Sequence, residues 1–315
     1  MRRLYFMGII LLFLITSCAK HAANPAQGTP GDYSYTLEHG GITRYYDVHI
    51  PSAYDGTKPM PAVIYLHGGG GNIQSAYKDG MDKESDKLGF ILVSPAGTGI
   101  LKTKILTWNA GYWSGGGCCG YALNHNIDDV GFISAMIDDL ETKFAVDNKR
   151  IYATGISNGG MMSYRLGCEL PEKIAAIAPD EPPAVPNGCA PKKPISVIHV
   201  QGTADPCTPY NGGEGGGCLP GAEKLITQSA KEMVDTWKTF NHCTGNPKTT
   251  YQKGETNCIS FSCDAGTEVT LCTVQGGGHT WPSGNQYLPA DKVGPVSYDI
   301  SFDQMWTLLQ AHHLD

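Results

Sequence analysis

Short apolar runs alternate with amphipathic stretches along most of the chain. The runs, each of which predicts a buried strand, cover residues 62–66, 90–94, 150–154, 174–179, 195–200 and 269–274. Between and after them, the predicted helices cover roughly residues 129–145, 158–168, 223–240 and 300–312. Apolar strands that alternate with helices are typical of a mostly parallel sheet with helices on both faces. The predicted fold class is therefore α/β.

Two segments predict antiparallel pairing instead. Residues 33–51 alternate between apolar and polar positions and turn at Gly40–Gly41, which indicates a hairpin. Residues 258–272 predict a second hairpin, which turns at 264–267. Residues 33–315 are accordingly predicted to form one domain.

The N-terminus has the pattern of an export signal. Arg2 and Arg3 precede an apolar stretch over residues 4–15 that is too short to span a membrane. Residues 1–17 are predicted to be the signal peptide, and Cys18 resembles the lipidated cysteine of a bacterial lipobox. Residues 18–32 then form a tether of small residues. This predicts a periplasmic or cell-surface lipoprotein that contacts the membrane only through its lipid anchor. The alternative is cleavage near Ala22 or Ala23, which would release a soluble secreted protein.

Composition narrows the class of partner. The chain has 315 residues, of which 41% are hydrophobic and 17% charged, and its formal net charge is −7. Such a chain can bury a substantial core. Its negative charge argues against nucleic acid or anionic lipid as the main ligand, because both require a cationic surface.

The cysteines agree with export. Ten of the 11 cysteines follow Cys18, and an even set in an exported chain indicates disulfides. Plausible pairs are Cys207 with Cys218, Cys168 with Cys189, Cys258 with Cys272, and Cys243 with Cys263. Adjacent cysteines rarely bond each other, so at least one of Cys118 and Cys119 is expected to pair elsewhere. The sequence has no C-x-x-C or H-x-x-x-H pair, so no metal site is predicted.

The motif G-x-S-x-G occurs at residues 155–159, between a predicted strand and a predicted helix. Small flanking residues allow a sharp turn that holds Ser157 in an unfavourable backbone conformation with its hydroxyl exposed above the sheet. Without that context the motif is weak, since the chain has 40 glycines. In this context Ser157 is the predicted nucleophile.

A serine nucleophile needs a histidine base and a carboxylate that orients it. His279 follows the strand 269–274, and Asp205 follows the strand 195–200, in the chain order serine, acid, histidine. Asp180, Glu181 and Asp291 are weaker candidates for the acid. His67 and His199 are predicted to be structural.

The reaction also needs two backbone donors for the oxyanion of the tetrahedral intermediate. One is predicted to be the N–H of Asn158, directly after the nucleophile. The other is predicted in the glycine-rich loop 66–72, at Gly69, with Gly68 or Gly70 as alternates, because glycine lets the backbone approach the reacting carbonyl.

Several of these blocks occur together in one known family. "LHGGGGN", "WNAG" with "CCG", "DDVGF", "YATGISNGGMMSYRL", "HVQGTADPCTPY" and "GGGHTWP" appear in order over residues 45–310. The chain thus resembles the polyhydroxybutyrate-depolymerase-like exported esterases, which include feruloyl and acetylxylan esterases of carbohydrate esterase family 1. The resemblance implies the α/β-hydrolase fold and a triad of Ser157, Asp205 and His279. The insertion "WSGGG" and the loop 207–218 depart from the family pattern.

The resulting hypothesis is a serine ester hydrolase without a cofactor, acting on feruloyl or acetyl esters of plant polysaccharide or oligosaccharide. Trp281, Trp113 and Tyr210 are candidates for stacking on the substrate, although most aromatic side chains are core. Asp128 and Asp129 are expected to cap a helix, and one of them is also a candidate for bracing the active-site loops. The alternatives are a depolymerase of hydroxyalkanoate polyesters and, in a different class, an inactive glycan-binding lipoprotein.

Overall fold

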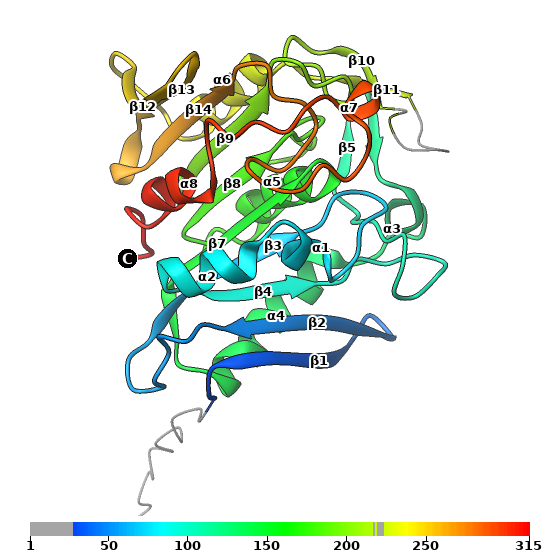
Figure 1. Ribbon diagram of the computed structural model, residues 1–315, viewed down its shortest axis with the longest axis vertical. Coiled ribbons are helices and arrows are strands. Elements are labelled where there is room, and N and C mark those ends of the chain that lie inside the picture. The colour runs from blue at the N-terminus through cyan, green and yellow to red at the C-terminus, as the bar shows by residue number, and fades with distance from the viewer. Residues whose placement is uncertain (1–27, 217, 219–223) are drawn as a thin grey trace, which may run out of the picture.

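The computed structural model describes residues 28–216, 218 and 224–315 (Figure 1). The predicted signal peptide, Cys18 and most of the tether lie outside the described residues, so those assignments stay predictions. Within the described part of the chain, no helix is both long enough and apolar enough to cross a membrane.

A 10-stranded sheet runs through the molecule in the order β1-β2-β4-β3-β7-β8-β9-β14-β13-β12. The six central strands, from β4 to β14 in this order, are parallel to one another, and two antiparallel strands extend the sheet at each edge. Their bounds are β1 Gly31–His39, β2 Ile42–Ile50, β3 Met60–Leu66, β4 Ile91–Pro95, β7 Val146–Ile156, β8 Ala176–Asp180, β9 Ser196–Gly202, β12 Lys248–Lys253, β13 Thr256–Ser262 and β14 Glu268–Val274.

The sheet confirms the predicted α/β fold with a mostly parallel core. All six apolar runs are central strands, and both predicted hairpins are present, as β1–β2 and β13–β14. The strand β12 was not predicted, because its sequence KTTYQK has no apolar pattern and its side chains are mostly exposed. It is an edge strand, which needs no buried face.

Helices cover both faces of the sheet (Figure 1). The helices α4 (Asp129–Lys143), α5 (Asn158–Glu169) and α6 (Ala230–Phe240) contribute to one apolar core, whereas α1 (Ser75–Lys78), α2 (Met81–Leu88) and α8 (Phe302–Leu309) contribute to the other. The strand β3 serves both cores: Ala62, Ile64 and Leu66 face one, and Val63 and Tyr65 face the other. A continuous apolar run is therefore needed in this strand, because it has no solvent-facing side.

The predicted helix 223–240 begins too early. Residues Lys224–Thr227 instead form β11, which pairs with β10 (Gly213–Gly216) in a separate two-stranded sheet. The helix α6 starts only after Ser229, whose side chain forms a capping box with Glu232. The remaining short elements are β5 (Gly111–Trp113), β6 (Gly116–Cys118), α3 (Gly120–Asn124), η1 (Asp264–Gly266) and α7 (Ala290–Val293).

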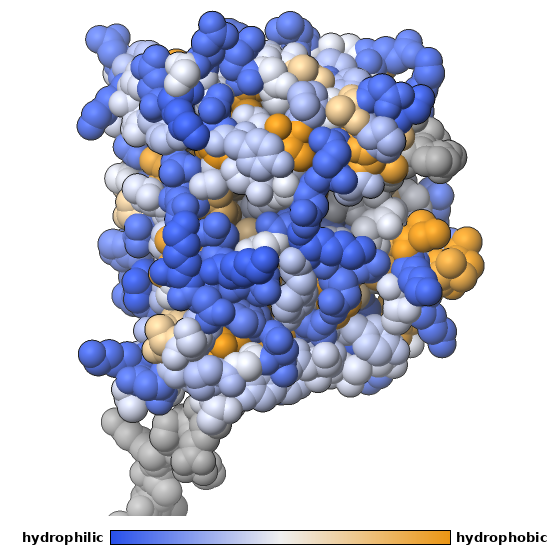
Figure 2. Space-filling model, viewed as in Figure 1, coloured by the Kyte–Doolittle hydropathy of each residue, from blue (hydrophilic) through white to orange (hydrophobic). Residues whose placement is uncertain are grey.

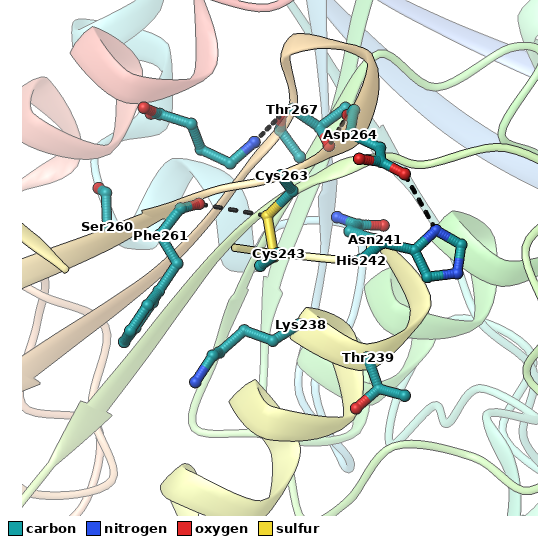
Figure 3. Close-up of a disulfide and its surroundings, with 12 residues drawn as sticks. Lys238, Thr239, Asn241, His242, Cys243, Ser260, Phe261, Cys263, Asp264 and Thr267 are labelled. Atoms are coloured by element: carbon teal, nitrogen blue, oxygen red, sulfur yellow. Dashed lines mark hydrogen bonds and ion pairs between the residues drawn. A yellow bond between two sulfur atoms is a disulfide. The ribbon is translucent and has the colours of Figure 1, made fainter. Parts of the chain in front are cut away.

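Four of the five disulfides are the predicted ones: Cys168–Cys189, Cys207–Cys218, Cys243–Cys263 and Cys258–Cys272. Figure 3 shows how Cys243, after α6, is joined to Cys263 at the end of β13, next to the contact of His242 with Asp264. The expectation for Cys118 and Cys119 was wrong, because these neighbours bond each other. The other eight cysteines pair among themselves, which leaves no third partner.

The surface is mostly polar on the face in Figure 2, with apolar side chains gathered toward one edge. The loop between β4 and β5 exposes three large aliphatic side chains, Ile100, Leu101 and Ile105, of which Ile100 is 83% exposed. The same loop doubles back through the bridge between Thr98 and Thr107 and pairs with Gly71 through Leu106. It therefore lies against the glycine-rich loop that follows β3.

We expect the Cys258–Cys272 disulfide to stabilise the β13–β14 hairpin covalently. Replacing both cysteines with alanine should lower the free energy of unfolding by about 3 kcal/mol, measured by chemical denaturation. The matched control is Ser260→Ala with Thr270→Ala, which removes a 2.7 Å side-chain hydrogen bond between the same two strands. The control should cost only about 1 kcal/mol. Equal losses in the two double variants would contradict this account.

Candidate active site

The candidate residues gather where four neighbouring strands end. The strands β7, β8, β9 and β14 are adjacent and parallel. Ser157 follows β7, Asp180 and Glu181 lie at the end of β8, and Asp205 and His279 lie in the loops after β9 and β14. The carboxyl edge of such a sheet is where ligands bind in α/β folds.

Ser157 sits on a strained turn. Its φ is 59° and its ψ is −119°, a region that residues with a side chain rarely adopt and that is typical of functional sites. The side chain makes no capping hydrogen bond to α5. The backbone N–H donates instead to the carbonyl of Asp180, at 2.8 Å. The predicted strand-to-helix turn at this serine is therefore present.

The end of β3 explains the two glycines of the motif. A Cβ at Gly155 or at Gly159 would overlap the carbonyl oxygen of Leu66. Only glycine lets β3 and the Ser157 turn approach this closely. Gly155 and Gly159 are thus required by packing, and they hold the turn beside the loop 67–71.

The predicted oxyanion donors lie next to each other. A Cβ on Gly69 would be 3.6 Å from the Cβ of Asn158, and one on Gly68 would be 3.7 Å from the Cβ of Ser157. The alternate Gly70 is not available, because its N–H donates to the carbonyl of Leu106 at 2.8 Å. The N–H of Asn158 is at the first turn of α5, where helical N–H groups have no partner within the helix.

The Asn158 side chain has a role that sequence reasoning missed. Its Oδ1 accepts from the N–H of Trp108 at 2.7 Å, and its Nδ2 donates to the carbonyl of Trp108 at 3.0 Å and to Sγ of Cys118 at 3.4 Å. Trp108 Nε1 also donates to the carbonyl of His67, at 3.0 Å. These bonds tie the serine turn, the glycine loop and the 108–118 segment together. The "WNAG" and "CCG" blocks were the available signal.

Asp205 and His279 form a buried hydrogen-bonded pair. His279 Nδ1 lies 2.8 Å from Asp205 Oδ2, and both side chains are almost fully buried. Asp205 Oδ1 accepts from the N–H groups of Cys207 and Thr208, and Oδ2 accepts from the Thr208 hydroxyl at 2.6 Å. Burial alone would raise the pKa of Asp205, but the charge of His279 and these hydrogen bonds outweigh it and lower the pKa to about 2. Asp205 is therefore an anion that orients the imidazole.

The serine is not joined to this pair by a hydrogen bond. Among the described residues, the hydroxyl of Ser157 has no hydrogen bond to His279. Catalytic hydrogen bonds are often long in ligand-free structures and tighten on substrate binding. The adjacent strand ends support a triad of Ser157, His279 and Asp205, and its last link stays a prediction.

One group of side chains has the spacing of a metal site. Ligand atoms of Asp205, Cys207 and His279 lie within 4.8 Å of one another. The sulfur of Cys207 is bonded to Cys218, so it is not a thiolate, and the other two side chains bond each other. This donor set fits an acid–base pair and not a zinc ligand set, which needs ionised thiolates or free imidazoles.

The other acid candidates are not hydrogen-bonded to His279. Glu181 Oε1 accepts from the N–H of Gly202 at 2.7 Å, and Asp180 has two buried oxygens without a partner. Burial and the nearby Asp205 carboxylate raise the pKa of both groups well above the usual range. Asp291, which is exposed on α7, pairs with Lys292 and has no hydrogen bond to the histidine. Asp205 is thus the favoured acid.

His67 and His199 are structural, as predicted. Of the two aspartates expected to cap α4, Asp128 does so and Asp129 does not. His67 Nε2 accepts from the N–H of Gly97 at 3.0 Å, and burial lowers its pKa to about 4. His199 is buried in β9, and burial lowers its pKa to about 3. Asp128 caps α4 by accepting from the N–H of Gly131. Asp129 pairs with buried Arg44 at 2.6 Å and accepts from the N–H of Asn109, so it braces the loop beside Trp108.

The aromatic candidates differ in exposure. Trp281 is 2% exposed and packs against Tyr65 and Phe302, and Trp113 is 4% exposed with its Nε1 bonded to the carbonyl of Ile226. The burial of Trp281 and Trp113 argues against direct stacking on a substrate. A substrate-binding role for either residue stays a prediction. Tyr210 is half-buried, and its hydroxyl is 2.8 Å from Oγ1 of Thr273.

Another aromatic residue, which sequence reasoning did not single out, lies close enough to Asp205 to be affected by its charge. Tyr287 is 49% exposed. Burial, followed by the charge of Asp205, raises its pKa. Its loop carries no motif in the sequence.

The proteins that this chain resembles in sequence are named as esterases, which fits the geometry of the site. Feruloyl esterase B of Piromyces equi is 33% identical over 238 residues, which are 74% of this chain and 42% of that protein. NocK of Nocardia uniformis subsp. tsuyamanensis, a protein named as an esterase, is 30% identical over 278 residues, or 83% of this chain and 77% of that one. The chain belongs to the feruloyl and acetylxylan esterase family of α/β-hydrolases. It is an esterase, a carboxylic ester hydrolase.

Solved structures agree with this family at the level of fold. The acetyl xylan esterase from Aspergillus awamori superposes with a TM-score of 0.59 at 15% identity, over 88% of this chain and 99% of that one. A thermostable esterase superposes with a TM-score of 0.53 at 13% identity, over 90% of this chain and 63% of that one. No protein-family model matches the chain. This esterase spans less than half the length of the feruloyl esterase B that it matches.

We expect Gly155→Ala to test the close approach of β3 to the serine turn. The new methyl group would overlap the Leu66 carbonyl, which cannot move without shifting the sheet. The free energy of unfolding should fall by about 1–3 kcal/mol, measured by chemical denaturation. Gly69→Ala is the control for stability, because its nearest atom would be at an ordinary contact distance of 3.6 Å. Equal stability of Gly155→Ala and the wild type would refute the packing argument.

Proposed function

We propose that this esterase is an exported serine hydrolase that cleaves feruloyl or acetyl esters from plant cell-wall polysaccharides such as xylan. The observation that carries the proposal is the strained Ser157 turn on the same sheet edge as the hydrogen-bonded Asp205–His279 pair. The names of the relatives support the substrate class, since they include feruloyl esterases and a bifunctional acetylxylan esterase/xylanase of Neocallimastix patriciarum.

The first half of the reaction acylates the serine. Because Nδ1 of His279 is bonded to Asp205, its Nε2 is the atom that would accept the Ser157 proton. The serine oxygen then bonds to the ester carbonyl carbon, and the protonated imidazole gives its proton to the departing sugar hydroxyl. Asp205 stays ionised and stabilises the imidazolium throughout.

The negative oxygen of the tetrahedral intermediate would be held by the N–H groups of Asn158 and Gly69. The contact between these two residues, and the commitment of Gly70 to Leu106, favour this pair of donors. In the second half of the reaction water attacks the acyl-enzyme, with His279 again as base, and the carboxylic acid leaves. No step requires a cofactor.

The disulfides support export. Ten cysteines bonded in pairs are typical of proteins that fold in an oxidising compartment. The proposed address is the periplasm or the cell surface, with a lipid on Cys18, and a secreted soluble form is the alternative. A lipid on Cys18 would keep the enzyme at the membrane while its substrate stays extracellular.

We expect Ser157→Ala to lose ester hydrolysis by a factor of about 10⁴ or more, because removing the nucleophile leaves only binding and the oxyanion donors. The assay is hydrolysis of methyl ferulate or acetylated xylan, with thermal unfolding as the check on folding. Ser163→Ala is the matched control, a buried serine on α5 that bonds only the carbonyl of Gly159. Full activity of Ser157→Ala would exclude Ser157 as the nucleophile. Failure of the folded wild type to hydrolyse these esters or to react with a fluorophosphonate would favour a non-catalytic glycan binder.

A substrate panel distinguishes the acyl groups. We expect kcat/KM for methyl ferulate or acetylated xylan to exceed that for short hydroxybutyrate oligomers by at least about tenfold, a difference worth about 1.4 kcal/mol in the transition state. Chromatography of the released acids is the measurement. Faster release of hydroxy acids would instead make the enzyme a polyester hydrolase with the same triad.

A further inference from the structure

A second buried carboxyl group lies behind the acid of the proposed triad. Glu181 is the first residue after β8, is 2% exposed, and has a φ of +48°. Residues with a side chain rarely adopt this backbone conformation unless the surroundings impose it. The Thr208 hydroxyl lies 3.2 Å from the carbonyl oxygen of Glu181 and 2.6 Å from Oδ2 of Asp205, so the two acidic residues meet at Thr208. Their carboxyl groups are within hydrogen-bonding range of each other.

The two carboxyl groups accept different numbers of hydrogen bonds. Asp205 accepts from Cys207 N–H, Thr208 N–H, the Thr208 hydroxyl and His279. Glu181 accepts only from Gly202 N–H through Oε1, and its buried Oε2 has no donor among the described residues. Two carboxylates in contact repel, whereas one proton between them makes a hydrogen bond. Because Asp205 accepts more hydrogen bonds than Glu181, the negative charge is more stable on Asp205. The shared proton is therefore expected on Glu181.

The surroundings offer Glu181 no positive partner. The groups that face it are Asp205 and Thr208 from the loop after β9, Asp180 from β8, and Tyr287 from the loop after β14, and Asp79 lies behind Asp180. Asp205 and Thr208 lie between Glu181 and His279. Burial, followed by the charge of Asp205, raises the pKa of Glu181.

We propose that Glu181 is a positioning residue of this site, whose protonated carboxyl donates to Asp205 and holds that carboxylate against His279. The inference rests on the proposed function for its kinetic consequence but not for the location of the proton. Glu181 does not touch the substrate. Its Oε1 fixes it to the end of β9 through Gly202, and its Oε2–H acts on the histidine through Asp205.

The kinetic test compares Glu181→Gln with Glu181→Leu. Glutamine keeps a neutral donor and an acceptor of the same length, so kcat and the acidic limb of the kcat/KM–pH profile should stay as in the wild type. Leucine removes both, so kcat should fall by about 10–100-fold, as for other residues that orient a catalytic group, with KM little changed. Glu172→Gln, an exposed glutamate on the loop after α5, controls for the chemical change.

Three kinetic outcomes would overturn the proposal. If Glu181 is ionised, neutralising it in Glu181→Gln removes a negative charge near His279 and moves the acidic limb down by about one pH unit or more. A folded Glu181→Gln as slow as Glu181→Leu would show that a neutral donor is not enough. Unchanged kcat in a folded Glu181→Leu would show that no donor is needed.

A stability measurement locates the proton without any activity. In the unfolded chain Glu181 ionises above a pH of about 4.3, while the native group keeps its proton to higher pH. The unfolded state then binds fewer protons, so the Tm of the wild type should fall relative to that of Glu181→Gln as the pH rises from 4 to 7. A pH-independent difference in Tm would place an ionised glutamate in the native protein. Because this readout needs no substrate, it stays valid even if Ser157→Ala disproves the esterase mechanism.

Discussion

The approach of the Leu66 carbonyl to two glycines is the contact on which the site depends. It places the end of β3 directly beside the turn of Ser157, with no side chain between the two backbones. Since the loop 67–71 continues from β3, the same contact sets where Gly69 lies relative to Asn158. The predicted nucleophile and oxyanion donors are thus positioned by backbone packing at the end of β3, which the side-chain bonds of Asn158 and Trp108 reinforce.

A second constraint is electrostatic. Asp205, Glu181 and Asp180 are neighbouring carboxyl groups, and Asp205 is bonded to His279; all three lie in an interior that disfavours charge. Of these three, Asp205 accepts the most hydrogen bonds, so it is the group best able to carry a negative charge beside the imidazole. Perturbed groups of this kind cluster at functional sites. The three carboxyl groups therefore differ in the number of hydrogen-bond donors that each receives, although all three are buried.

Much of the architecture was predictable from the sequence because its signals are local. Apolar runs marked the six central strands, and the alternation around Gly40–Gly41 marked an edge hairpin. Ser157, Asp205 and His279 were found from a motif and from their positions after strands. The disulfides of β13 and β14 followed from hairpin register, since Cys258 and Cys272 are directly opposite.

The parts that were missed depend on contacts between distant segments. The bonds of the Asn158 side chain to Trp108 and Cys118 join residues 40 to 50 positions apart, and no spacing rule encodes them. The burial of Trp281 is decided by Phe302 and Tyr65, which come from other elements. The edge strand β12 is polar and exposed, so no apolar pattern marks it. The short strand β11 was included in the predicted helix 223–240, which in fact starts after Ser229.

The complete pairing of the cysteines after Cys18 has a practical consequence for work on this enzyme. A chain that begins after Cys18 presents no thiol to a maleimide dye while it is native and oxidised. Any labelling would then come from bridges that have been reduced or never formed. Fluorescence from such a dye would therefore count incompletely oxidised molecules in a preparation, with no engineered cysteine required.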